Sequence, residues 1–258
     1  MKLVEIFEKL EIPNKESIVF FHIAAERLKP ITDIAGIFKA INYYFDNKST
    51  ICMPSYPFSG AEYYNYLTSQ PIFDVRNTPC RVNLVCEIFR RQDKVIRTLH
   101  PWCSVAAGGK NAFEIVSEHH LDKKVFGKKS PFQKIVNKGG YVVGLGVDCN
   151  TNSFAHLPDD KMLKNYTFEI YDKKYYTFKV IDYSGKELYI KTNVLLEEII
   201  KKIKPRKMRQ FYISQNFYKE YIFNNIEFYR MKLDLFLNYT VKINTKIIKT
   251  EGKPIYYV

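Results

Sequence analysis

The first 160 residues alternate short apolar runs with segments whose apolar residues recur at helical spacing. Residues 17–23 (Ser-Ile-Val-Phe-Phe-His-Ile) and residues 49–53 have the β-branched and aromatic content of buried strands. Residues 140–147 form a third such run, which continues into a glycine-containing turn. Strands that alternate with helices favour an α/β fold with a central mixed sheet flanked by helices. In such sheets, ligands bind where the strands end in loops.

Capping residues mark the expected starts of three helices. Thr32 precedes apolar residues that share one helical face over 34–44. The pairs Thr78-Pro79 and Ser130-Pro131 each place a hydroxyl residue before a proline, which is favoured in the first turn of a helix. We therefore expect helices to begin after Thr32, after Thr78 and after Ser130.

The pattern changes after about residue 160. Residues 166–171 and 175–180 resemble the two strands of a hairpin, with the turn at 172–174. Residues 182–186 are expected to form a second turn that leads into a strand at 188–190, and residues 193–204 are expected to be helical. We expect two sections: residues 1–160 as the α/β core, and residues 161–258 as an appended antiparallel β/α section that is not an independent domain.

The charge and the cysteines narrow the function classes. The formal net charge is +13, which suits an anionic partner and argues mildly against a polycationic substrate. The five cysteines form no CxxC pair, and the N-terminus lacks the apolar region of a secretory signal. No apolar run is long enough to span a bilayer. These features predict a cytoplasmic protein with reduced thiols and no membrane insertion.

Several short motifs follow one another in an order that is characteristic of one family. The motifs are Phe73-Asp74-Val75-Arg76-Asn77-Thr78-Pro79, Phe89-Arg90-Arg91, Leu99-His100-Pro101 with Ser104-Val105-Ala106-Ala107, His120-Leu121-Asp122, Ser130-Pro131-Phe132 and His156-Leu157 followed by Asp159. With the strands around His22 and Met53, they make the first 160 residues resemble the aminoglycoside 3-N-acetyltransferase family. The resemblance extends to N-acyltransferases that act on nucleotide-linked amino sugars.

The chain departs from the family pattern at four places. Ile23-Ala24-Ala25 replaces the serines that follow the histidine of the first strand, and Cys80 replaces the serine after Thr-Pro. Cys103 stands in place of a second histidine, and Asp159 in place of a glutamate. We expect these changes to alter how the acceptor is recognised.

The resemblance implies that an amine attacks acyl-CoA directly, without a covalent enzyme intermediate. The amine must lose a proton, and a neutral imidazole can accept it. We expect His156 to be this general base and Asp159 to orient its ring. The alternative for His156 is a packing role beneath the glycine turn. A second alternative makes Cys103 a nucleophile paired with His100.

Acyl-CoA is the expected co-substrate, and no metal is expected. Its phosphates need cations and backbone N–H groups, which the two predicted helix starts would supply. The residues expected to contact it are Thr78, Arg81, His100, Ser104, Ser130, Pro131 and Phe132. For His100, a purely structural role is an equal alternative. The acceptor is expected to contact His22, Tyr56 and Asp74.

The expected reaction is transfer of an acetyl or short hydroxyacyl group to the amine of a nucleotide-linked amino sugar, with residues 161–258 completing the acceptor site. The first alternative is aminoglycoside 3-N-acetylation. A different class is a nucleic-acid-binding protein that uses the basic segment 201–207, although we expect no nucleic-acid partner. An acyltransferase fold without activity is a further alternative. The sequence is compatible with a homo-oligomer.

Overall fold

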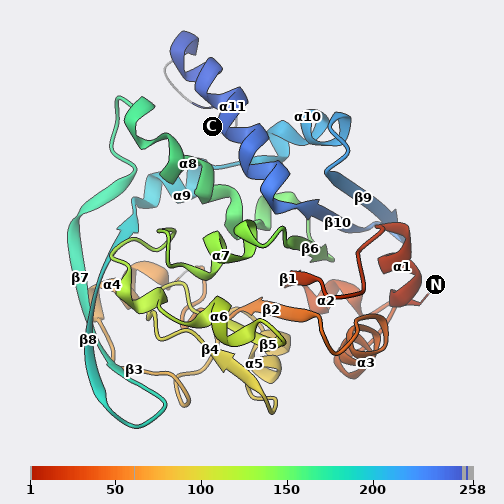
Figure 1. The fold of residues 1–258 in the computed structure, drawn as a ribbon, viewed down its shortest axis with the longest axis horizontal. Helices are drawn as coiled ribbons and strands as arrows, with labels where there is room; N and C mark the ends of the chain where they lie inside the picture. The colour runs from red at the N-terminus through yellow and green to blue at the C-terminus, as the bar shows by residue number, and fades with distance from the viewer. Residues whose placement is uncertain (1, 61, 252–253, 255–258) are drawn as a thin grey trace.

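The computed structural model describes residues 2–60, 62–251 and 254 (Figure 1). Seven strands form the main sheet. In spatial order they are β4 (Val95–Arg97), β5 (Val105–Gly109), β2 (Thr50–Pro54), β1 (Ile18–Ile23), β6 (Tyr141–Leu145), β10 (Ile226–Lys232) and β9 (Tyr218–Phe223). The three strands expected from the apolar runs are thus the three in the middle of the sheet.

The sheet is mixed, as the sequence predicted. β1 pairs in parallel with β2 on one side and with β6 on the other. The outer pairs β2–β5, β4–β5, β6–β10 and β9–β10 are antiparallel. Because β2, β1 and β6 run in the same direction, their carboxyl ends lie along one edge of the sheet. The loops that follow these strands therefore meet at that edge.

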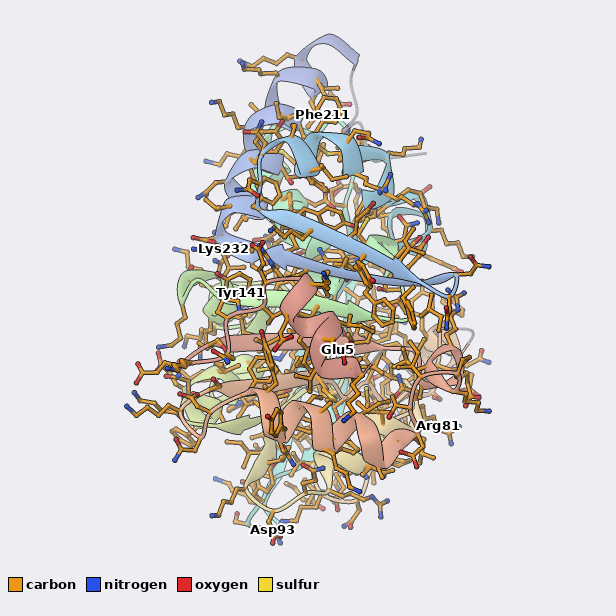
Figure 2. All side chains as sticks on the ribbon, turned by 90° about the vertical axis from the view of Figure 1, so that its right-hand side faces the viewer. Glu5, Arg81, Asp93, Tyr141, Phe211 and Lys232 are labelled. Atoms are coloured by element: carbon orange, nitrogen blue, oxygen red, sulfur yellow. The ribbon has the colours of Figure 1, made fainter. Side chains whose placement is uncertain are left out.

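Side chains alternate between two apolar layers, one on each face of the sheet. In β1, Phe20 packs into one layer, whereas Val19 and Phe21 pack into the other. The Phe20 layer includes residues of α6 (Ala112–Val116), α7 (Pro131–Asn137) and α11 (Leu233–Glu251). The Phe21 layer includes residues of α1 (Leu3–Lys9), α2 (Ala25–Leu28), α3 (Ile34–Tyr44) and α5 (Leu84–Arg90). Figure 2 views the molecule from the side of α1 and shows the strands one below the other.

The helix starts match the sequence expectations unevenly. Ser130 caps α7 as predicted, because its side chain accepts a hydrogen bond from the Gln133 backbone N–H at 3.2 Å. The cap of α3 is Asp33 and not Thr32. The helix expected after Thr78 begins later, at Leu84, where the Asn83 side chain accepts from the Cys86 N–H at 2.9 Å. Residues 79–83 are therefore not helical.

The C-terminal section is built into the fold in two ways. Its strand β10 pairs with β6, so it extends the main sheet. A second sheet contains β3 (Phe73–Asp74), β7 (Tyr171–Ile181) and β8 (Glu187–Leu195), in that order. In Figure 1, β7 and β8 form a long hairpin at the left edge of the molecule, opposite the N-terminus.

Two expectations for this section were wrong. Residues 172–174 form no turn but lie within β7, where the pairing with β8 shifts between Tyr171 and Tyr175. The hairpin turn is at residues 182–186, where Gly185 adopts a positive φ of 86°. Residues 193–195 belong to β8, and the helix that follows, α9, spans only Glu197–Lys202.

Short helical segments follow β6. Gly146, with a φ of 74°, turns the chain away from the sheet. The 3₁₀ helices η2 (Cys149–Thr151) and η3 (Ser153–His156) come next, and α8 (Leu157–Met162) continues directly from η3. The long helix α11 packs against α7 and α8. Within the described residues, no helix combines the length and the apolar character needed to cross a membrane.

Candidate active site

A cavity of about 390 Å³ lies where the loops after β2 and β6 meet. Five of its lining residues are aromatic, and most of its polar residues come from the segment after β6. The lining consists of Tyr56, Phe58, Ser59, Gly60, Tyr63, Arg81, Val82, Trp102, Cys103, Phe126, Asn150, Thr151, Asn152, Ser153, Ala155, His156, Leu195, Ile200 and Ile203. The volume and the mixture of aromatic walls with a few polar groups are typical of small-molecule sites.

His156 lies at this cavity, at the junction of η3 and α8. Its ring packs against Phe126, with 5.3 Å between the ring centroids. Burial lowers the pKa of His156 to about 4, because desolvation disfavours the charged imidazolium. The imidazole is therefore neutral at pH 7 and can accept a proton. His156 thus presents a neutral imidazole in the wall of the cavity.

The Nδ1 atom of His156 is buried and has no hydrogen-bond partner among the described residues. Asp159, expected to orient this ring, is fully buried, and its Oδ1 accepts a hydrogen bond from the Tyr166 hydroxyl at 2.7 Å. The expected hydrogen bond from Nδ1 to Asp159 is therefore not formed in this structure. The contact of the imidazole with the Phe126 ring helps to orient it instead.

Ser153 joins three elements at the cavity. Its backbone N–H donates to Nε2 of His22, the residue near the end of β1, at 3.3 Å. Its hydroxyl is 2.8 Å from the Tyr56 hydroxyl, which follows β2. Burial lowers the pKa of His22 to about 3, so its ring is neutral and Nε2 can accept. His22 and Tyr56, expected to contact the acceptor, are brought together through Ser153.

Sequence reasoning missed Ser153. The available signal was its position three residues before His156, because side chains three apart are eclipsed on a 3₁₀ helix. Both residues belong to η3 and both line the cavity.

His100 has a structural role and does not line the cavity. The side chain is fully buried, and Nε2 lies 3.0 Å from the Thr192 hydroxyl. Nδ1 accepts from the Trp102 backbone N–H at 3.3 Å. Because both ring nitrogens are used, His100 cannot activate Cys103. Burial also raises the pKa of the Cys103 thiol, so a Cys103–His100 nucleophile is not supported.

Ser104 and Thr78, expected to contact acyl-CoA, instead surround a buried arginine. Arg97 Nη1 donates to the Thr78 carbonyl at 2.6 Å, and Nε donates to the Ser104 hydroxyl at 3.2 Å. Arg97 Nη2 and the Ser104 hydroxyl both donate to the Ser55 carbonyl. Burial lowers the pKa of Arg97 to about 10, which leaves it charged at pH 7. Sequence reasoning missed Arg97, which fixes the backbone just before Tyr56.

Arg81, expected to contact acyl-CoA, lines the cavity, whereas Asp74, expected to contact the acceptor, does not. About 58% of the Arg81 side chain is exposed, and Nη1 lies 3.7 Å from the Glu62 carboxylate. Figure 2 shows Arg81 near the right-hand margin of the molecule.

The Asp74 carboxylate accepts from the Asn77 backbone and side chain at 2.9 and 2.8 Å. Asp74 therefore stabilises a turn away from the cavity.

Ser130, Pro131 and Phe132 are buried and do not line the cavity. Phe132 packs against Phe20, Phe126 and Phe154 in the core. The phosphate-binding role expected for the start of α7 stays a prediction, and the side chain of Phe132 belongs to the core.

The charge of the described cavity lining is positive. Among the described residues that line it, there is no aspartate or glutamate, and Arg81 is the one side chain with a permanent charge. The part of the chain that the structure describes also contains no group of three or more His, Cys, Asp or Glu residues placed to hold a metal ion. The polar groups that line the cavity are an imidazole, hydroxyls, the amides of Asn150 and Asn152, the Cys103 thiol and one guanidinium.

Comparisons with known proteins agree with this architecture. A sequence profile described as aminoglycoside 3-N-acetyltransferase matches residues 20–237. The "SPbeta prophage-derived aminoglycoside N(3')-acetyltransferase-like protein YokD" of Bacillus subtilis (strain 168) is 31% identical over 93 residues. That alignment covers 35% of this chain and 34% of the relative, so it spans about a third of the relative's length.

Solved structures share the fold over nearly the whole chain. The crystal structure of YokD from Bacillus subtilis has a TM-score of 0.74 at 20% identity, covering 95% of this chain and 94% of the other. A structure described as AAC-IIIb binary with CoASH has a TM-score of 0.75 at 16% identity, covering 98% and 97%. AAC-VIa bound to sisomicin has a TM-score of 0.71 at 17% identity, covering 93% and 95%.

Proposed function

We propose an acyl-CoA-dependent N-acyltransferase activity for this chain, which belongs to the aminoglycoside 3-N-acetyltransferase family. The observation that carries the proposal is the placement of a neutral histidine, His156, in the wall of a ligand-sized cavity. Family membership, and a structural relative solved with CoASH, support acyl-CoA as the co-substrate.

The reaction follows from the chemistry of the side chains. The amine nitrogen attacks the thioester carbonyl carbon, and His156 takes the proton that the amine loses. The tetrahedral intermediate then collapses, the carbon–sulfur bond breaks, and the thiolate of CoA takes the proton back from His156. The products are an amide and free CoA, so no covalent enzyme intermediate is needed.

The comparisons favour an aminoglycoside as the acceptor. The family profile carries that name, and a structural relative was solved with sisomicin. In that case, the amine acetylated is one amino group of a polycationic sugar. The cavity described here would then have to bind a cation without a carboxylate in its lining.

The charge of the cavity favours a second acceptor class, a nucleotide-linked amino sugar. Its diphosphate would suit Arg81, and its base would suit the aromatic walls formed by Tyr56, Phe58 and Trp102. The net charge of +13 agrees with an anionic acceptor.

One assay tests the activity and separates the acceptors. The protein is mixed with acetyl-CoA and with a panel of aminoglycosides and nucleotide-linked 3-amino and 4-amino sugars, and thiol release is followed. We expect release that depends on the added amine. Release that never depends on an amine would contradict the proposed function, and the preferred panel member identifies the acceptor class.

A further inference from the structure

We propose that the paired hydroxyls of Tyr56 and Ser153 donate a hydrogen bond to the thioester carbonyl oxygen and stabilise the negative charge that develops there. This inference rests on the proposed acyl transfer. It adds two catalytic residues beside the base.

The placement of the two hydroxyls supports this role. Tyr56 and Ser153 both line the cavity that contains His156, and their oxygens are 2.8 Å apart. Ser153 precedes His156 by one turn of η3, so both side chains belong to the same face of that helix. A carbonyl carbon attacked beside His156 would thus have its oxygen within the region of these hydroxyls.

The number of protons leaves one donor for a ligand. The two hydroxyls carry two protons, and their mutual hydrogen bond uses one of them. The remaining proton has no acceptor among the described residues. Because burial raises the pKa of Tyr56 well above 10, the phenol keeps its proton and remains a donor at neutral pH.

The backbone of Ser153 is fixed independently of its side chain. Its N–H donates to Nε2 of His22, a buried and neutral imidazole on the central strand β1. His22 is therefore a positioning residue that anchors the start of η3 on the sheet. A donor held in place before the reaction needs no reorganisation as charge develops, which is the condition for efficient oxyanion stabilisation.

Electrons and protons are conserved in this step. As the nitrogen–carbon bond forms, the electron pair of the carbonyl double bond moves to the oxygen, and the hydroxyl pair hydrogen-bonds to it. His156 takes the amine proton. When the carbonyl reforms, the electron pair returns, the thiolate leaves, and the hydroxyl pair keeps both of its protons.

The test is the kinetics of Tyr56→Phe and Ser153→Ala. We expect each variant to lower kcat by ~100-fold while the KM for acetyl-CoA changes by less than about threefold. The double variant should be slower than either single one, because each single variant keeps one hydroxyl that can still donate to the oxygen. Tyr66→Phe is the matched control, since Tyr66 donates to the Pro101 carbonyl in the core and does not line the cavity.

Other outcomes separate the two proposals. If the unmodified protein shows no amine-dependent thiol release, the proposed function fails. If it is active and the folded variants keep kcat within about threefold, the hydroxyl pair is not an oxyanion donor. A loss confined to KM or to thermal stability would also overturn the inference. Should Ser153→Ala fail to fold, Ser153→Thr retains a hydroxyl and must retain most of kcat.

Discussion

The imidazole rings of His100 and His119 stack in the core, with 4.1 Å between their centroids and 16° between their planes. Both side chains are fully buried. Burial lowers the pKa of each ring. Repulsion from a charged His119 would lower the pKa of His100 further. A proton on either ring would therefore be buried without a counterion.

These histidines predict a protein that loses stability in mild acid. The pKa of His22 and of His119 is about 3 when folded, against an ordinary value of 6.5, and that of His100 is also far below it. Below pH 6.5 the unfolded chain binds protons that the folded chain does not, so stability falls as the pH falls. His156, with a pKa of about 4, acts in the same direction. Each histidine contributes ~1.4 kcal/mol per pH unit, or roughly 6 kcal/mol at pH 5.5 for the four.

Thermal unfolding between pH 7.5 and 5.5 measures this effect. We expect a marked decrease in Tm over that range. In His119→Phe, which cannot be protonated, the dependence should be weaker by about a quarter. An unchanged pH dependence in this variant would show that the stacked pair is not its source.

Replacement of His156 tests the base. We expect His156→Ala and His156→Asn to lower kcat by ~100-fold or more, with little change in acyl-CoA binding. Because the pKa of His156 is about 4, kcat should show no inflection near pH 6.5 from the enzyme. The pH profile is repeated with acceptor amines of different known pKa, which shows which inflection belongs to the amine and which to the protein. Near-normal turnover in both variants would mean that the amine loses its proton to water.

Arg97 offers a test of the structure behind the cavity. Arg97→Met should lower the free energy of unfolding by ~3 kcal/mol, because it leaves the Ser55 and Thr78 carbonyls without this donor. The control is Arg91→Met, since 65% of the Arg91 side chain is exposed. That variant should change stability by less than ~0.5 kcal/mol. Urea titrations of both variants make the comparison, and equal effects would rule out the proposed support by Arg97.

Arg81→Glu tests the charge of the acceptor. If the acceptor is a nucleotide-linked sugar, the substitution should raise its KM by ~10-fold or more, because an attractive charge becomes repulsive. If the acceptor is an aminoglycoside, the same change should lower KM. Steady-state kinetics with the best acceptor of each class decides between the two. A KM that does not move in either case would show that Arg81 lies outside the acceptor site.

The middle of the sheet could be predicted from sequence because β1, β2 and β6 are buried on both faces and so read as continuous apolar runs. The β7–β8 hairpin was predictable in part: the strand at 175–180 and the turn at 182–186 were expected, but the full length of β7 was not. Asp172-Lys173-Lys174 has the polarity of a turn, yet the chain passes through it with only a shift in strand pairing. The start of α5 was misplaced because Thr78-Pro79 has the composition of a helix start, whereas Asn83 supplies the cap.

The site was predictable where residues follow parallel strands. Tyr56 and His156 were singled out from sequence, and both line the cavity. Ser104 and Ser130 were assigned to ligand binding, yet both are fully buried. Sequence shows that a hydroxyl lies in a loop, but the packing of Arg97 and Phe132 determines whether that hydroxyl faces a ligand or the core.

The pairing of the central strand has a consequence for synthesis of the chain. β1 pairs with β6, so that Phe20 lies opposite Val142, more than 100 residues later. Until β6 has left the ribosome, one edge of this strongly apolar strand has no partner. Such unpaired edges promote aggregation of nascent chains, and contacts this distant in sequence form late in folding. The strand at the centre of the finished sheet is thus one whose second edge stays unpaired through much of the synthesis of the chain.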